Sequence, residues 1–99
     1  MKNPMEIFKD FELRIDYRVT ECLEPPFLVY TSKGSNNLNA ENKVYYSQYD
    51  YVIEYYFNTK DEELEKRIEE RLNENEVVWS KSGDIFFEEE DVSLIYYYI

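Results

Sequence analysis

The chain has 99 residues, the length of one compact domain, so we expect residues 1–99 to form a single domain. Hydrophobic residues make up 43% of the chain and aromatic residues 18%, a composition that argues against a disordered protein. The net charge of −11 argues against binding to nucleic acid or to an anionic membrane through a basic surface.

The first part of the chain predicts a short helical turn and two strands. Residues 5–8 follow Pro4 and predict the helical turn, because proline is favoured at the start of a helix. Apolar and polar residues alternate along residues 11–19, a pattern typical of a half-buried strand. Residues 27–31 are apolar, follow a pair of prolines and predict a second, shorter strand.

Residues 42–58 carry the clearest strand pattern in the sequence. Seventeen residues exceed the usual length of a strand, so we expect a bulge or bend near residues 47–49. The odd positions are expected to share one face of the sheet, and they are Tyr45, Tyr49, Tyr51, Ile53, Tyr55 and Phe57.

A single amphipathic helix is expected after this strand, over about residues 59–74. Thr59 and Glu62 have the spacing of a capping box, in which each side chain satisfies a free backbone amide at the start of a helix. Leu64, Ile68 and Leu72 then recur every four residues and form a narrow apolar stripe.

The last part of the chain predicts two or three strands. Residues 77–79 begin one, Gly83 and Asp84 supply a turn, and residues 85–87 form another. Residues 92–99 are hydrophobic at both odd and even positions, which indicates a strand that is central in the sheet or covered by a partner. The sequence therefore predicts an α+β fold of two layers, a mainly antiparallel sheet with one helix on one face.

The residue types of most catalytic and metal sites are scarce. The chain has no histidine and one cysteine, Cys22, whereas zinc sites are built from both residue types. Two glycines do not make a phosphate-binding loop. We therefore expect no metal, no cofactor, no catalytic residue and no enzymatic activity. One cysteine cannot form an internal disulfide, which favours a reducing or redox-indifferent compartment.

Several residues are candidates for contacts with other proteins. Tyr46 and Tyr56 are predicted to lie on the face opposite the core, and Leu38 lies in an Asn-rich loop expected over residues 33–43. Aromatic residues fit the pleated surface of a sheet, but they are also enriched at protein interfaces. The pattern leaves open whether the tyrosines serve the core alone or the core and an interface.

Four consecutive acidic residues form the densest charge in the chain: Glu88, Glu89, Glu90 and Asp91. Calcium loops place acids at alternating positions around a glycine, so we do not expect a metal here. The run is either a solvated turn or a patch that repels a polyanion. It also belongs to a strongly acidic region, because residues 59–99 contain thirteen acidic and five basic side chains.

The order of several segments resembles a known family. EPPFLVY at residues 24–30 is followed by the Asn-rich loop, NKVYY at 42–46, YVIEYY at 51–56, a helix with KDEELE at 60–65 and a Tyr-rich C-terminal strand. Over residues 24–99 this order resembles the small tail-completion or tail-terminator proteins of long-tailed phages and prophages of Gram-positive bacteria. Family members tend to open with a longer apolar helix, whereas residues 1–11 supply only a turn or two.

The resemblance implies a non-enzymatic virion protein with a small α+β fold. Such proteins form a hexameric ring on the finished tail tube, and their partners are the tail tube protein and the head–tail connector proteins. DNA passes through the ring without specific binding, and the acidic run at residues 88–91 would face its path. The implied location is the virion tail, assembled in the host cytoplasm, and no membrane is involved.

A second interpretation follows from the charge and small size alone. An acidic inhibitor that imitates DNA, or an immunity protein that neutralises a basic nuclease toxin, would carry the same excess of carboxylates. A terminator is expected to form rings or to bind tail tubes. An inhibitor is instead expected to be a monomer or dimer that binds one basic protein with a steep dependence on salt.

Overall fold

The computed structural model describes residues 3–20, 24–32 and 50–99. These residues form two helices and six strands, which follow the predicted order of a short helix, three strands, a long helix and further strands. In chain order the elements are α1 (Pro4–Ile7), β1 (Ile15–Tyr17), β2 (Phe27–Ser32), β3 (Tyr51–Phe57), α2 (Glu62–Glu74), β4 (Ser80–Lys81), β5 (Ile85–Phe87) and β6 (Val92–Tyr98).

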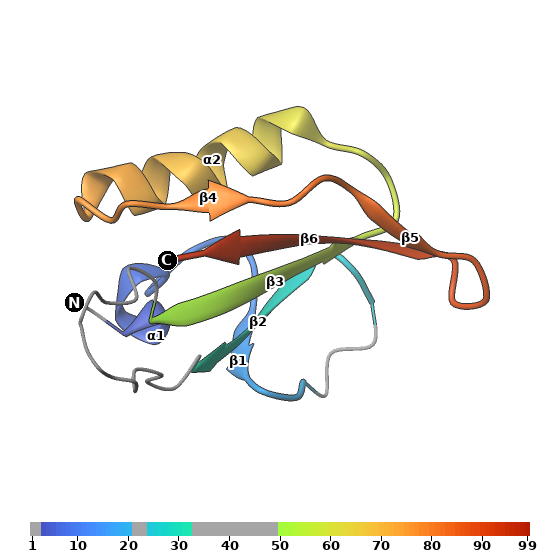
Figure 1. Cartoon of the computed structure of the whole chain (residues 1–99), viewed down its shortest axis with the longest axis horizontal. Helices are drawn as coiled ribbons and strands as arrows, with labels where there is room; N and C mark the ends of the chain where they lie inside the picture. Colours follow the sequence, from blue (N-terminus) through green and yellow to red (C-terminus); the bar gives the residue numbers. More distant parts are fainter. Residues whose placement is uncertain (1–2, 21–23, 33–49) are drawn as a thin grey trace, which may run out of the picture.

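The six strands form one sheet in the order β1-β2-β3-β6-β4, and β5 also pairs with β6 (Figure 1). Of the described strand pairs, β1 and β2 are parallel and the others are antiparallel. The mainly antiparallel α+β fold expected from the sequence is therefore confirmed. β6 is an inner strand, since β3 lies on one side of it and β4 and β5 lie on the other.

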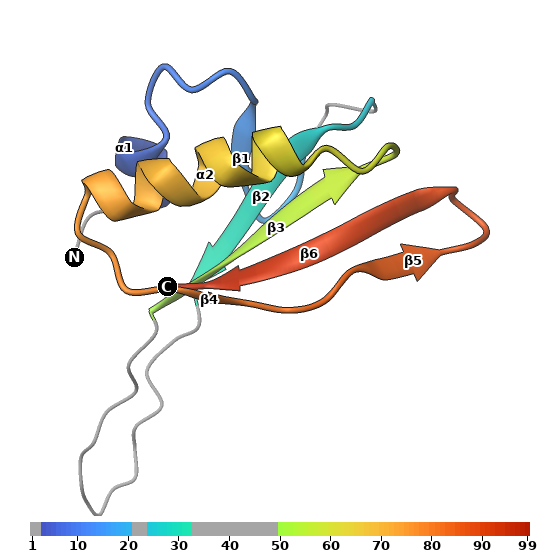
Figure 2. The same ribbon diagram turned by 90° about the horizontal axis from the view of Figure 1, so that it is seen from above.

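Both helices lie on the same face of the sheet (Figure 2). The apolar stripe of α2 is confirmed, because Leu64, Ile68 and Leu72 are 4%, 0% and 0% exposed and belong to the main core cluster. α1 is tied to α2 by the Arg71 guanidinium, whose Nη1 donates to the backbone carbonyl of Ile7 at 2.9 Å. The core therefore lies between the two helices and one face of the sheet.

α2 begins two residues later than a helix capped by Thr59 would. Its N-cap is Asp61, whose Oδ1 accepts a hydrogen bond from the amide of Leu64 at 3.1 Å. The predicted capping box of Thr59 and Glu62 is therefore wrong, because a stronger N-cap residue stands closer to the apolar stripe. The end of α2 agrees with the prediction, since Asn75 is its C-cap.

The strand predicted over residues 11–19 is much shorter in the structure. Only β1 joins the sheet, while Phe11 and Leu13 pack against the core from irregular backbone. Left-handed φ angles of 61° at Asp10 and 70° at Arg18 bound this segment. The alternation therefore identified Phe11, Leu13 and Ile15 as packing against the core, but Tyr17 and Val19 are exposed, and the backbone hydrogen bonds of the strand span only three residues.

The described part of the third predicted strand matches the sequence pattern. Ile53, Tyr55 and Phe57 are buried on the helix-covered face, as expected from their odd positions. The rest of that prediction, including the bulge near residues 47–49, lies outside the described residues. So does the predicted loop over residues 33–43.

The strand predicted from residues 77–79 is wrong. The amide of Val77 donates to the carbonyl of Leu72 at 3.0 Å, so the chain is still closing the end of α2 at this point. Trp79 remains near the helix as well, because its Nε1 donates to Oδ1 of Asn73 at 2.9 Å. After α2, the chain returns to the sheet only at β4.

Gly83 and Asp84 do not reverse the chain as a turn would. β4 and β5 continue along the same edge of β6, but three residues separate Lys81 from Ile85 where two residues separate Tyr97 from Leu94 on β6. The extra residue makes a β-bulge. The Ser82 side chain supports it, because Oγ accepts the amide of Tyr96 at 3.0 Å.

Candidate functional site

The face of the sheet opposite the helices is rich in aromatic side chains. No described helix or strand packs against it (Figure 2). The rings of Phe27 and Tyr56 stack with centroids 5.0 Å apart, and those of Tyr96 and Tyr98 stack at 6.0 Å. We call this surface the open face.

Tyr56 lies on the open face, opposite the core, as its even position in the strand pattern predicted. Its hydroxyl donates to Oε1 of Glu54 at 2.6 Å, which holds the ring in place. Burial and then the Glu54 carboxylate raise the pKa of Tyr56 above its ordinary value. The hydroxyl therefore stays protonated at neutral pH and remains a donor. The other two predicted contact residues, Leu38 and Tyr46, lie outside the described residues.

The bulge at Ser82 enlarges the open face. After it, Ile85 pairs with Leu94 and Phe87 pairs with Val92, and paired residues of neighbouring strands share a face. If the same residues continued from Lys81 in an unbroken ladder, Ile85 would pair with Ser93, and Ile85 and Phe87 would point toward the helix side. They are instead 37% and 39% exposed on the open side of the sheet.

The acidic run forms the turn that joins β5 to β6, and it extends from one end of the sheet (Figure 1). All four side chains, of Glu88, Glu89, Glu90 and Asp91, are exposed, and none forms an ion pair with a described residue. The Asn58 side chain fixes the backbone there, because its Nδ2 donates to the carbonyl of Asp91 at 2.8 Å. We call these four residues the acidic turn.

The described residues contain no group of three or more acidic or cysteine side chains arranged to hold a metal ion. The four carboxylates of the acidic turn are consecutive and exposed, so the turn is a local concentration of negative charge. No helix in the described ranges is long and apolar enough to cross a membrane.

A partly buried ionic network lies between α2 and the sheet. Glu65 is 4% exposed, and its carboxylate contacts Nζ of Lys60 at 2.7 Å and Nζ of Lys81 at 3.2 Å. Lys81 also contacts Glu69 at 2.6 Å, and the Tyr97 hydroxyl donates to the same Glu69 oxygen at 2.8 Å. Two lysines therefore compensate a carboxylate that would otherwise be buried without a partner.

The pKa values of Lys81 and Tyr97, two members of the network, are both raised. Burial lowers the pKa of Lys81, but hydrogen bonds to Glu69 and Glu65 outweigh it, and the net shift is upward. Burial, followed by the hydrogen bond to Glu69, raises the pKa of Tyr97 above its ordinary value. The sequence gives no sign of this network beyond an acid beside an apolar position of α2.

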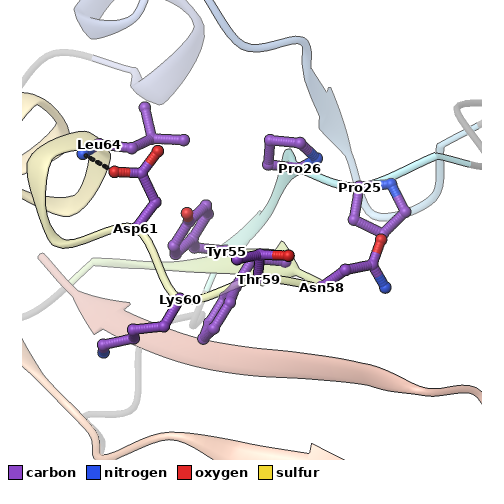
Figure 3. A pocket seen from close by; sticks show the side chains of 9 residues that line it. Pro25, Pro26, Tyr55, Asn58, Thr59, Lys60, Asp61 and Leu64 are labelled. Atoms are coloured by element: carbon purple, nitrogen blue, oxygen red, sulfur yellow. Dashed lines mark hydrogen bonds between the residues drawn. The ribbon is translucent and has the colours of Figure 1, made fainter.

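A pocket of about 300 Å³ opens where β3 leads into α2. Figure 3 shows Pro25 and Pro26 on one side of it and Tyr55, Asp61 and Leu64 on the other. The Tyr55 hydroxyl is buried and makes no hydrogen bond within the described residues. Burial, then the Glu65 charge, raises its pKa, so it remains a neutral donor.

The charged groups at the pocket already serve the fold. Lys60 is paired with Glu65 and, at 3.1 Å, with Asp84, and Asp61 caps α2. We therefore interpret the pocket as a gap in the packing between helix and sheet, and not as a binding site. Among the residues that the structure describes, the surfaces that we consider for a partner are the open face, the two outer edges of the sheet and the acidic turn.

Comparison of the chain with protein-family models, with curated proteins and with solved structures found no match.

Proposed function

We propose that the protein is a tail-completion or tail-terminator subunit of a long-tailed phage. In this role it forms a ring, hexameric by resemblance, at the head-proximal end of the tail tube and joins the tube to the head connector. It works by assembly and not by catalysis, and its place is the virion tail. The proposal rests first on the order of sequence segments over residues 24–99.

The open face is the structural observation that supports this proposal best. A ring subunit must contact a neighbour on each side and further proteins above and below. The helices occupy one face of the sheet, so half-buried aromatic rings such as Tyr56, Tyr96 and Tyr98 remain for a partner on the other. Tyrosine and phenylalanine are enriched at such contacts.

The acidic turn fits a ring through which DNA passes. Four carboxylates without ion pairs among the described residues repel the phosphate backbone, and this repulsion suppresses binding during passage. The same carboxylates are the observation that favours the alternative function, an acidic inhibitor of a basic protein. The two functions differ in how the protein assembles.

Assembly in the presence of tail tubes tests the proposal. We expect purified protein mixed with purified tail tubes to appear as a ring at one end of each tube by electron microscopy. Mass photometry of the protein alone measures whether rings also form in its absence. A protein that stays monomeric and never associates with a tube would contradict the terminator and favour the inhibitor.

Neutralising the acidic turn is expected to leave the fold intact. The variant changes Glu88, Glu89 and Glu90 to Gln and Asp91 to Asn. Exposed charges contribute at most about 1 kcal/mol each to stability, and Asn tolerates the left-handed φ of 54° at position 91. Denaturant titration is expected to give a free energy of unfolding within about 1 kcal/mol of the parent value.

The same variant separates the two functions. A terminator with a neutral turn is expected to keep its association with tail tubes and to bind DNA more readily, because the repulsion is reduced. An inhibitor is expected to lose its basic partner. A variant that fails to fold would contradict both and would point to a structural role for the turn.

A further inference from the structure

Most of the exposed large apolar side chains lie on the two outer edges of the sheet. Seven such residues occur among the described residues, and five of them belong to these edges. On one edge, Tyr17 is 50% exposed and Val19 is 77% exposed. On the other, the exposed residues are Ile85, Phe86 and Phe87. Clusters of this kind mark interaction sites more often than isolated exposed residues do.

We name these surfaces by their strands. The β1 edge surface consists of Tyr17, Arg18 and Val19. The β5 edge surface consists of residues 85–87 together with the acidic turn that follows. β1 and β5 lie at opposite edges of the sheet, with β2, β3 and β6 between them (Figure 2).

The two surfaces have complementary charge. The Arg18 guanidinium lies 5.9 Å from the centre of the Tyr17 ring and makes no ion pair with any described residue. Its backbone is fixed, because its amide donates to the carbonyl of Tyr30 at 2.8 Å. The β5 edge surface carries four carboxylates that are likewise without ion pairs in the described part of the chain. If the two surfaces met, the Arg18 cation would face four carboxylates, and excess negative charge would remain beside the contact.

The backbone of β1 is also available for a neighbour. The amide of Leu28 donates to the carbonyl of Arg14, and the amide of Arg18 donates to the carbonyl of Tyr30, so the even-numbered residues face β2. The backbone groups of Ile15 and the amide of Tyr17 then point away from the sheet, while the Tyr17 carbonyl accepts the amide of Val19 at 2.7 Å. An outer strand with this arrangement favours pairing with another chain.

Contact between like edges is disfavoured. Two β5 edge surfaces would bring two acidic turns together, and like charges in an interface cost free energy. Two β1 edge surfaces would bring two Arg18 side chains together. Contact between unlike edges joins opposite charges and leaves one free edge of each kind, so further copies can add until the ring closes.

We infer that the β1 edge surface of one copy binds the β5 edge surface of the next, so that the chain associates head to tail. This inference rests on the proposed ring and names the contact between its subunits. The apolar residues provide the buried area, and Arg18 against the acidic turn sets the direction of association.

Cysteine cross-linking tests the contact. In a chain with Cys22→Ser, one variant carries Val19→Cys and Phe86→Cys, and two others carry one of these changes each. A short bismaleimide is expected to join the double variant into a ladder of dimers, trimers and larger species. The single variants are expected to show no cross-linked species on a denaturing gel, because each edge meets only the opposite edge.

A matched control uses Val78, which is 75% exposed but lies on neither outer strand. The pair Val19→Cys with Val78→Cys is expected to give no ladder. Dimers in either single variant would overturn the head-to-tail arrangement, and a ladder in the control or none in the test pair would overturn the contact. Thermal unfolding of each variant, compared with the parent, shows that the exposed substitutions leave the fold intact.

The cross-linking result is separable from the proposed function. Rings on tail tubes without a ladder from Val19 and Phe86 would overturn this contact and leave the terminator function standing. A ladder without any association with tail tubes would support the head-to-tail contact and contradict the terminator function.

Discussion

Ile68→Ala is expected to lower the free energy of unfolding by about 2–5 kcal/mol, the range for truncating a large aliphatic side chain in a packed core. Ile68 is fully buried in the middle of α2, where neither helix end can move to fill the cavity. We therefore expect a larger effect than for Leu64→Ala or Leu72→Ala. Denaturant titration of the purified variants measures the difference.

The matched control is Lys66→Ala, on the exposed side of the same helix. It is expected to change stability by no more than about 0.5 kcal/mol, as surface substitutions usually do. A value this small for Ile68→Ala would contradict the position of α2 on the sheet.

Raising the pH above about 10, the ordinary pKa of tyrosine, is expected to destabilise the protein steeply. Tyr55 and Tyr97 are fully buried, and burial raises the pKa of both. The folded protein therefore keeps two protons that the unfolded chain releases. Their contribution is fully present below about pH 10 and is lost above it at about 1.4 kcal/mol per pH unit for each tyrosine.

Denaturant titrations between about pH 9 and pH 11 measure this slope, and the ultraviolet absorbance of phenolate reports the ionisation. Tyr56, Lys60 and Lys81 act in the same direction, since their pKa values are also raised in the folded protein. In Tyr97→Phe the slope is expected to fall by about 1.4 kcal/mol per pH unit, because one titrating group is gone. Equal slopes in the parent and Tyr97→Phe would contradict the burial of this hydroxyl as the cause.

The sequence predicts those parts of the fold that depend on periodicity. The stripe of Leu64, Ile68 and Leu72 identified the buried side of α2, and the alternation through Ile53, Tyr55 and Phe57 identified the core face of β3. Both patterns record the contact of a side chain with the core, and the burial of apolar surface there is the main driving force of folding. Parity also placed Tyr56 on the open face.

The features that sequence could not predict depend on backbone geometry or on distant partners. Asp10 and Arg18 adopt left-handed φ angles that usually favour glycine, so nothing marks them as the limits of the segment around β1. Thr59 and Asp61 can both cap a helix, and the capping-box spacing of Thr59 with Glu62 favours Thr59, whereas the stronger N-cap residue Asp61 caps α2. Glu65 is an acid on a highly charged helix, and its burial depends on Lys60 and on Lys81, sixteen residues later.

The β5 edge surface shows the same limit. The sequence predicts a strand over residues 85–87, but the face that each side chain occupies depends on the bulge at Ser82. A strand pattern of three apolar residues carries no parity of its own, since both faces read alike. The composition of the open face could therefore be predicted at Tyr56 and not at Ile85 or Phe87.

The bulge also determines how the strand edge tolerates a change in chain length. Removing one residue between Lys81 and Ile85 would leave two residues there, as on β6, and would restore an unbroken ladder in which Ile85 still pairs with Leu94. Ile85 and Phe87 would therefore stay on the open face and Phe86 on the other. A one-residue deletion at this point is expected to preserve the surface chemistry of residues 85–87 and to remove only the local bend of the strand.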